Sequence, residues 1–213
     1  MSLIDLKHAF PFAVNTRTVP QDSHGWLDER HKQVFKKIIT PDVHLFVELG
    51  VWLGKTTRFI AETYPQMEIV SIDHWQGSPE HANMPEVRDK LPTLYETFIA
   101  NTFAYRQRVN PLRMNTVQGL KQLAMFDVDP DMFYVDAGHD TISVLEDLET
   151  IHALFPDAII MGDDYSWRES GTKIKPVREA VRRFCDKYKL KFELPKLPTM
   201  TNMTCYQIFQ GTI

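Results

Sequence analysis

Acidic residues stand at the ends of four predicted strands. Glu48, Asp73 and Asp136 each close an apolar run, and the pair Asp163 and Asp164 closes a fourth. An aspartate at a strand end often only begins a turn, so one such residue says little. Four along one edge indicate a site, because parallel strands place their carboxyl ends at the same edge, where α/β proteins bind ligands.

Asp136, Asp163 and Asp164 form a candidate metal site. Three neighbouring carboxylates repel one another strongly unless they are protonated or neutralised by a cation. Oxygen ligands without a cysteine beside them suit Mg²⁺, and less specifically Ca²⁺ or Mn²⁺. A bound Mg²⁺ would lower the pKa of a substrate hydroxyl and orient it, so Asp136 is a catalytic as well as a metal-binding candidate. The alternative is that Asp163 and Asp164 open a turn and that Asp136 caps the next helix.

His139 lies three residues after Asp136, near the start of a predicted helix. A histidine close to its ordinary pKa is a credible general base for a hydroxyl group, and we predict a catalytic role. The alternative is a helix-start residue bonded to the backbone. The loop 75–90, with Met84 between Pro79 and Pro85, is a candidate cover for the substrate and contains His81. The other histidines show no ligand spacing, and we expect structural or surface roles for His8, His24, His31, His44 and His152.

Residues 47–57 predict the end of a buried strand, a glycine turn and the first turn of a helix. That geometry directs backbone N–H groups and the positive end of the helix dipole at one point. Glu48 at the strand end would repel a pyrophosphate, whereas a ribose hydroxyl or an amino group would donate a hydrogen bond to it.

The glycine spacing argues against two phosphate-binding motifs. A dinucleotide loop needs Gly-x-Gly-x-x-Gly, but only Gly50 and Gly54 are present and Trp52 stands between them. Gly54-Lys55-Thr56 matches the end of a P-loop, but Gly50 is one residue too close. A nicotinamide oxidoreductase is therefore disfavoured. A ligand with an amino-acid end and a nucleoside end, but no phosphate, fits better.

Asp73 follows the glycine loop at the distance where an acid accepts both ribose hydroxyls of a nucleoside. His74 and Trp75 come next and are candidates to pack on an adenine ring. The alternatives are a turn aspartate at 73, a core tryptophan at 75, and ordinary helix caps for Thr56 and Thr57.

Strands and helices alternate along the chain after an irregular stretch, residues 1–22. Continuous apolar strands between helices indicate a parallel sheet covered on both faces. The last two strands have no helix between them, so they should pair antiparallel at one edge. The predicted fold is α/β, a Rossmann-like doubly wound, mostly parallel seven-stranded sheet with an antiparallel edge strand. We expect strands at 43–49, 68–73, 112–117, 132–136, 158–162, 191–194 and 203–210, and helices at 23–39, 55–64, 87–108, 120–126, 141–154 and 174–188.

Length and composition agree with one globular α/β domain. The chain has 213 residues and a formal net charge of −4, so a general nucleic-acid or membrane-surface binder is not expected. No apolar run reaches membrane-spanning length, and the first residues lack a signal pattern. Cys185 and Cys205, in a predicted helix and strand, are expected to be buried thiols, and we expect a soluble cytoplasmic protein.

Four motifs occur in a fixed order: Val-Glu-Leu-Gly-x-x-x-Gly-Lys-Thr, Ser-Ile-Asp, Tyr-Val-Asp-Ala-Gly-His with Asp147 downstream, and Gly-Asp-Asp-Tyr. Together they resemble the class I S-adenosylmethionine-dependent methyltransferases over about residues 43–185. Within that superfamily the chain is most similar to the small metal-dependent O-methyltransferases that include macrolide-sugar methyltransferases and cephalosporin-hydroxylase-like proteins.

The resemblance implies a donor site and a metal site. The loop would hold the methionine part of the donor, Asp73 would bind the ribose, and Gln118 would lie near the adenine. The chain departs from the family near Gln118, where an acid is frequent, and at 156–158, where a glycine turn is usual. The metal-dependent members place their ligands at the motifs of Asp136, Asp163 and Asp164. The implied donor-binding residues are Glu48, Gly50, Gly54, Lys55, Thr56, Asp73, His74 and Gln118.

We therefore predict S-adenosylmethionine-dependent methyl transfer to a hydroxyl of a small molecule, assisted by Mg²⁺. Residues 41–213 would form the methyltransferase domain, and residues 1–40 an N-terminal extension with a lead-in helix. The alternative is a non-catalytic S-adenosylmethionine-binding accessory protein of a hydroxylase-like system. No nucleic acid or membrane partner is expected, and a homo-oligomer is possible on this sequence. The acceptor is not indicated.

Overall fold

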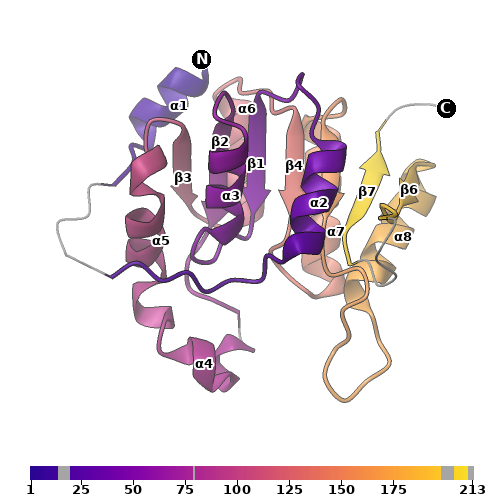
Figure 1. Cartoon of the computed structure of the whole chain (residues 1–213). Coiled ribbons are helices and arrows are strands. Elements are labelled where there is room, and N and C mark those ends of the chain that lie inside the picture. Colours follow the sequence, from indigo (N-terminus) through magenta and orange to yellow (C-terminus); the bar gives the residue numbers. More distant parts are fainter. Residues whose placement is uncertain (14–19, 79, 198–203, 211–213) are drawn as a thin grey trace.

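A computed structural model of the chain describes residues 1–13, 20–78, 80–197 and 204–210. A seven-stranded sheet in the order β3-β2-β1-β4-β5-β7-β6 forms its centre (Figure 1). Neighbouring strands are parallel except for β7, which is antiparallel to both β5 and β6. The predicted fold class is confirmed, with the reversed strand standing between β5 and the edge strand β6. The strands are β1 (Leu45–Leu49), β2 (Glu68–Asp73), β3 (Val109–Arg113), β4 (Met132–Val135), β5 (Ile159–Gly162), β6 (Lys191–Glu193) and β7 (Tyr206–Phe209).

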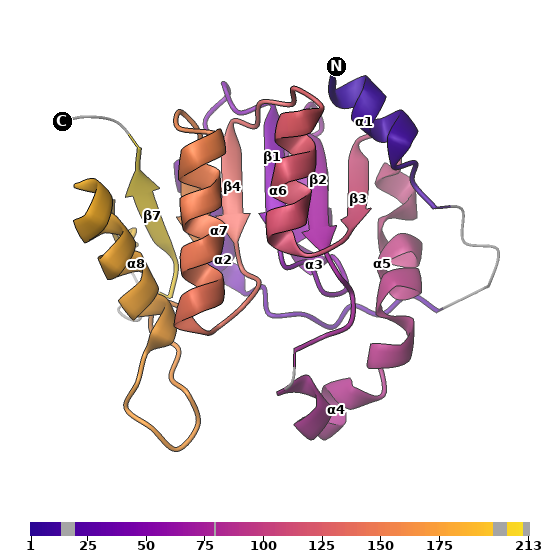
Figure 2. The ribbon, with the colours of Figure 1, turned by 180° about the vertical axis from the view of Figure 1, so that it is seen from behind.

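Helices cover both faces of the sheet, as Figures 1 and 2 show from opposite sides. One face carries α2 (Glu29–Ile38), α3 (Lys55–Thr63) and α5 (Leu94–Thr102). The other carries α6 (Thr116–Met125), α7 (Thr141–Leu154) and α8 (Pro176–Tyr188). Each face has its own apolar core, and every residue of β1 is buried between them, which explains why the strand has a continuous apolar run rather than an alternating one.

The N-terminal residues pack against the sheet on both faces. Residues 1–22 were expected to be irregular, but α1 (Leu3–Ala9) is a helix that Ser2 caps, and its Leu6 is fully buried in one core. The predicted helix 23–39 begins only at Glu29, because Asp28 caps it and fixes its start. Val34 and Phe35 of α2 are fully buried in the other core.

The predicted long helix 87–108 is broken into shorter elements. α4 (Pro85–Arg88) begins at a proline, and a 3-10 turn (Leu91–Thr93) containing Pro92 separates it from α5. Proline cannot donate to the helical hydrogen-bond ladder, which accounts for the break. Further 3-10 turns are His81–Asn83 and Phe103–Tyr105.

The third strand lies earlier than residues 112–117. β3 is Val109–Arg113 and contains Pro111, which an edge strand tolerates because one side of it needs no ladder bonds. Asn115 caps α6 at Thr116, so the helix also begins earlier than the expected residue 120. Cys185 is a free buried thiol in α8, and Cys205 is free and buried immediately before β7. Met203, the expected start of the last strand, and Pro79 lie outside the described residues.

The strand ends and helix starts meet at one edge of the molecule. The carboxyl ends of β1, β2 and β4 point toward α4 and toward the loop that follows β5 (Figure 1). None of the described helices is long and apolar enough to span a membrane.

Candidate active site

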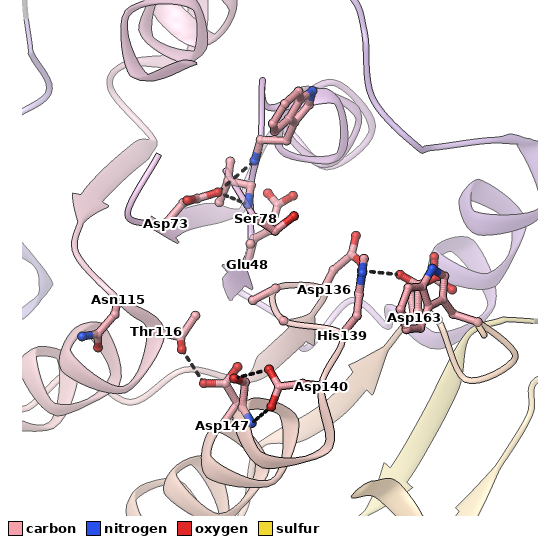
Figure 3. A pocket seen from close by; sticks show the side chains of 18 of the residues that line it. Glu48, Asp73, Ser78, Asn115, Thr116, Asp136, His139, Asp140, Asp147 and Asp163 are labelled. Atoms are coloured by element: carbon pink, nitrogen blue, oxygen red, sulfur yellow. Dashed lines mark hydrogen bonds and ion pairs between the residues drawn. The ribbon is translucent and has the colours of Figure 1, made fainter. Parts of the chain in front are cut away.

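A cavity of about 1990 Å³ lies at the carboxyl ends of β1, β2, β4 and β5 (Figure 3). Pockets for one small molecule usually measure ~300–1,000 Å³. The cavity therefore has room for two molecules side by side. Of the sequence-predicted site residues, Gly54 and the adenine candidate Trp75 do not line it; those that do are Glu48, Gly50, Lys55, Thr56, Asp73, His74, Gln118, Asp136, His139, Asp163 and Asp164.

The glycine loop brings backbone N–H groups to the cavity wall. Gly50 has φ +80°, and a Cβ there would lie 2.1 Å from the backbone oxygen of Asp136, so only glycine fits between the ends of β1 and β4. Gly54 has φ +76° and starts α3 without any side-chain cap. Thr57 is no cap either, because its hydroxyl donates to Glu48. The first N–H groups of α3 therefore remain for a ligand.

Glu48 is a buried carboxyl at the base of the loop, 2% exposed. The Thr57 hydroxyl donates to its Oε2 at 2.5 Å. Burial raises the pKa of Glu48 to about 8, and the charge of Asp73 adds to the rise while the Thr57 hydrogen bond opposes it. The carboxyl is thus mostly neutral at pH 7, and a cationic group beside it would favour its ionisation.

Asp73 is bonded to the glycine loop. Its Oδ2 accepts from the backbone N–H groups of Val51 at 2.8 Å and Trp52 at 3.0 Å, and its Oδ1 accepts from Trp75 at 2.6 Å. Each carboxylate oxygen has two acceptor sites, so capacity for a further donor remains. Trp75 itself is 2% exposed and packs on Tyr95, so it is a core residue and not an adenine contact. The exposed ring of His74 does line the cavity, 3.7 Å from Oδ1 of Asp73.

A segment of the N-terminal extension is attached to the loop. Lys55 donates from Nζ to the backbone oxygen of Gly25, and the Trp52 indole N–H donates to His24. Around this attachment the rings of His24, Trp26, Trp52 and His81 pack together. The sequence alone does not predict this cluster, because its rings come from three separate segments of the chain.

Asp136, His139 and Asp164 meet in the second half of the cavity, where one ligand atom from each lies within 4.8 Å of the others. Nε2 of His139 is 3.0 Å from Oδ2 of Asp164, and Nδ1 is 2.8 Å from Oε1 of Glu80. Asp164 has φ +59°, a strained conformation for a residue with a side chain, and such strain is concentrated at functional sites. Asp136 does not cap the next helix, because Asp140 caps α7.

Burial and like charges control the protonation of this group. Burial, followed by the charges of Asp163 and Asp164, raises the pKa of the Asp136 carboxyl well above its usual value. Burial lowers the pKa of His139, but its hydrogen bonds and ion pairs with Asp164 and Glu80 outweigh burial and raise it overall. The negative charges of Asp164 and Glu80 therefore favour the protonated form of His139, and a cation beside Asp164 would weaken that effect.

Asp163 belongs to a separate buried group. Its Oδ2 lies 2.6 Å from Nε2 of His31, and His31, Asp163 and Cys205 place ligand-type atoms within 4.8 Å of one another. Nδ1 of His31 is 2.8 Å from the capping residue Asp28. Of the three aspartates predicted to share one ion, Asp136 and Asp164 lie together with His139, whereas Asp163 faces His31. His31, expected to be structural or at the surface, is a buried partner of a site residue.

A further acid lines the cavity beyond the predicted set. Asp147 is 2% exposed, and the Thr116 hydroxyl donates to its Oδ1 at 2.5 Å (Figure 3). Burial raises the pKa of Asp147 to about 7. Gln118 lies near this pair at the start of α6, where its N–H donates to Asn115. The wall between α6 and α7 is therefore polar.

Residues 47–165 match the family described as methyltransferase domain. No curated protein matches the sequence. The chain belongs to the methyltransferase domain family, and the resemblance to class I S-adenosylmethionine-dependent methyltransferases is confirmed. The family match supports S-adenosylmethionine as the methyl donor.

Solved structures share the fold at low identity. A putative caffeoyl-CoA O-methyltransferase from Staphylococcus aureus is 13% identical, with a TM-score of 0.55 over 98% of this chain and 90% of that chain. An O-methyltransferase from Bacillus cereus in complex with SAH is 17% identical, with a TM-score of 0.51 over 78% and 73%. The calicheamicin methyltransferase CalS11 is 15% identical, with a TM-score of 0.55 over 84% and 80%. These likenesses establish the fold.

Proposed function

We propose that this protein transfers the methyl group of S-adenosylmethionine to a hydroxyl group of a small molecule, with the assistance of Mg²⁺. The observation that carries the proposal is that one cavity holds both the glycine loop with Glu48 and the group Asp136, His139 and Asp164. The names of the structural neighbours, which include O-methyltransferases, support oxygen as the acceptor atom.

The glycine-loop half of the cavity suits the donor. The uncapped N–H groups at the start of α3 would bind the donor's carboxylate, and Glu48 would accept from its ammonium group. Asp73 would bind the ribose and His74 would lie beside it, while Gln118 and the polar wall near Asp147 would face the adenine. Gly50, Gly54, Lys55 and Thr56 shape this half of the site.

The other half suits a hard cation. Asp136 and Asp164 place carboxylate oxygens within 4.8 Å of one another, and burial together with the neighbouring negative charges disfavours the ionised form of Asp136 unless a cation compensates. We assign Mg²⁺ to these two residues. Asp163 precedes Asp164 in the chain, and its negative charge would add to the attraction for the cation. When bound, the ion would lower the pKa of the acceptor hydroxyl and orient it.

His139 is the proposed proton acceptor. With Asp164 neutralised, the attraction that keeps the imidazolium charged is weaker, and Nε2 becomes free to take the hydroxyl proton. Glu80, on Nδ1, orients the ring and stabilises the charge that develops on it.

Two measurements test the proposal. Isothermal titration measures the binding of S-adenosylmethionine. Turnover is then followed as S-adenosylhomocysteine formed with a panel of diols and phenols in the presence of Mg²⁺. We expect micromolar donor binding and Mg²⁺-dependent turnover. Asp164→Asn should lose the Mg²⁺ dependence and keep donor binding, while the control Asp157→Asn, at an exposed position, should match the unaltered protein. Failure to bind the donor would contradict the proposal. Binding without turnover on any acceptor would instead favour a non-catalytic donor-binding protein.

A further inference from the structure

A histidine, an aspartate and a cysteine from three distant segments of the chain meet beside the cavity. His31 belongs to α2, Asp163 follows β5, and Cys205 precedes β7. One ligand-type atom from each lies within 4.8 Å of the others, and all three side chains are buried. Imidazole nitrogen, carboxylate oxygen and thiolate sulfur are the ligand types of protein zinc sites.

The cysteine distinguishes this group from the group of Asp136, His139 and Asp164. Mg²⁺ takes oxygen ligands, whereas Zn²⁺ also accepts nitrogen and sulfur. The sequence places no cysteine near the aspartates, but the fold brings Cys205 to Asp163. The two groups therefore favour different cations.

Asp163 has an oxygen available for an ion. Its Oδ2 lies 2.6 Å from Nε2 of His31, whereas its Oδ1 is buried and has no hydrogen-bond partner among the described residues. A buried oxygen of this kind is costly to leave unpaired. Two ligands of one zinc ion, with bonds of about 2.0–2.3 Å, lie roughly 3–4 Å apart. A bound ion would therefore replace the direct contact with His31 and bind Oδ1.

His31 has the second partner that metal-bound histidines usually have. Its Nδ1 lies 2.8 Å from Oδ1 of Asp28, the residue that caps α2. A histidine bound to zinc commonly donates its other ring N–H to a carboxylate, which fixes the ring and leaves one nitrogen for the metal. Asp28 would hold the proton on Nδ1 and leave Nε2 for the ion.

Zinc binding would leave the net charge of this buried group unchanged. Burial, followed by the charges of Asp163 and Asp136, raises the pKa of the Cys205 thiol far above its usual value, so the thiol is neutral. Burial lowers the pKa of His31, but its contacts with Asp163 and Asp28 outweigh burial and favour the imidazolium. Zn²⁺ would displace one proton from Nε2 and one from Sγ. Both the protonated group and the complex with neutral imidazole, carboxylate and thiolate are uncharged.

An ion can reach this group from the cavity. His31, Asp163 and Thr204 line the cavity wall, and Thr204 is followed directly by Cys205. Three protein ligands leave the fourth position of a tetrahedral zinc ion for a water molecule or a ligand from the cavity.

We propose that His31, Asp163 and Cys205 form a second metal site, which binds Zn²⁺ or a similarly soft divalent cation. The ion joins α2, the loop after β5 and the segment before β7. It therefore stabilises the folded state, because the unfolded chain does not hold the three ligands together. The proposal does not depend on methyl transfer.

Co²⁺ tests the site, because it occupies zinc sites and a thiolate ligand gives it a charge-transfer absorption in the near ultraviolet. The full chain, freed of metal with a chelator, is titrated with Co²⁺ in excess Mg²⁺. We expect the charge-transfer band, its loss when Zn²⁺ is added, and release of about two protons per ion. Co²⁺ bound by the Asp136 group has no thiolate ligand and gives no such band. Absence of the band would overturn the proposal.

Variants of the two cysteines locate the ion. Cys205→Ser and Cys205→Ala should each abolish the band and weaken Zn²⁺ binding at least about tenfold. The matched control Cys185→Ser, at the other buried thiol, should retain both. A band that survives in both Cys205 variants, or that disappears in Cys185→Ser, would overturn the proposal.

Thermal unfolding in excess Mg²⁺ gives an independent measurement. Zn²⁺ should raise the unfolding temperature of the unaltered protein and of Cys185→Ser, but not of the Cys205 variants. Equal rises in all of them would contradict the site. S-adenosylmethionine affinity, measured on the same samples, reports separately on the proposed function and on whether each variant folds.

Discussion

Glu48 is a buried carboxyl, and we propose that it binds the cationic ammonium group of the donor. Its pKa is raised to about 8 by burial, so the carboxyl carries a proton at neutral pH before the donor binds. An ammonium group beside it would favour the ionised form and displace that proton. Donor binding and proton release are therefore linked at this residue.

Titration of the donor at pH 7 in buffers of different ionisation enthalpy should show release of up to about one proton, and Glu48→Gln should abolish the release. Because the folded pKa is raised, the folded state binds more protons than the unfolded state between pH 4.5 and about 8. Glu48 should therefore make stability fall as pH rises through that window, and the slope should become smaller in Glu48→Gln. Glu193→Gln, at an exposed residue of β6, should retain both effects. Donor binding without proton exchange would contradict the role of Glu48.

His31 supplies the buried partner of Asp163, so His31→Ala should leave a buried carboxylate without its ion pair. Breaking such a pair costs about 3–5 kcal/mol, and chemical denaturation measures the loss. His8→Ala, at an exposed histidine, is the control and should change stability by less than about 0.5 kcal/mol. Asp163→Asn should restore part of the stability lost in His31→Ala, since it removes the unpaired charge. An additive double variant would show that the two side chains do not interact.

At the scale of the elements, the loop between β1 and α3 depends on glycine because of what lies opposite it. A Cβ at residue 50 would lie 2.1 Å from a backbone oxygen and 2.4 Å from the Cα of Ala137, and neither can move without shifting β4. Backbone clashes of this kind are relieved only by displacing a strand.

Gly50→Ala should destabilise the protein by more than the ~1–2 kcal/mol of a positive-φ alanine alone and should abolish donor binding. Gly171→Ala is a matched control: its φ is +74°, yet no atom lies within 4 Å of the added Cβ. It should cost only the backbone strain and leave donor affinity intact. Equal losses of stability in the two variants, measured by thermal unfolding, would show that the clash is not decisive.

The sequence predicts some elements better than others, for identifiable reasons. The prediction for β2 is confirmed at both ends, because its apolar run is followed directly by Asp73. β3 begins three residues before the predicted start and includes Pro111. A proline is tolerated there because β3 is an edge strand, and only the sheet order reveals that position. The acids at strand ends could be expected to gather at one edge. The pairing of Asp163 with His31 could not, because His31 lies 132 residues away in the chain.

At the scale of the whole molecule, the N-terminal residues contribute buried side chains to the cores on both faces of the sheet. Leu6 of α1 is fully buried against one face, and α1 lies toward the edge opposite the cavity (Figure 1). Lys7 adds an ion pair to Glu68 at 2.6 Å. We therefore propose that the described part of residues 1–40 folds together with the proposed domain 41–213 as one unit.

Leu6→Ala should destabilise the whole domain by about 2–5 kcal/mol, in a single unfolding transition, while leaving donor affinity unchanged. Ile4→Ala, at a residue of the same helix that is 65% exposed, should change stability by less than about 0.5 kcal/mol. Two separate transitions, or equal effects of the two variants, would show that α1 is independent of the sheet.

The hydrogen bonds from Val51 and Trp52 to Asp73 affect how variants of that residue must be interpreted. Amide protons held by a carboxylate exchange slowly with deuterated solvent, and Asp73→Asn would weaken both bonds at once. Lost donor affinity in that variant would therefore report a loosened loop as readily as a missing ribose contact. Deuterium uptake at the Val51 and Trp52 amides, followed in the protein without donor, separates the two roles of this one carboxylate.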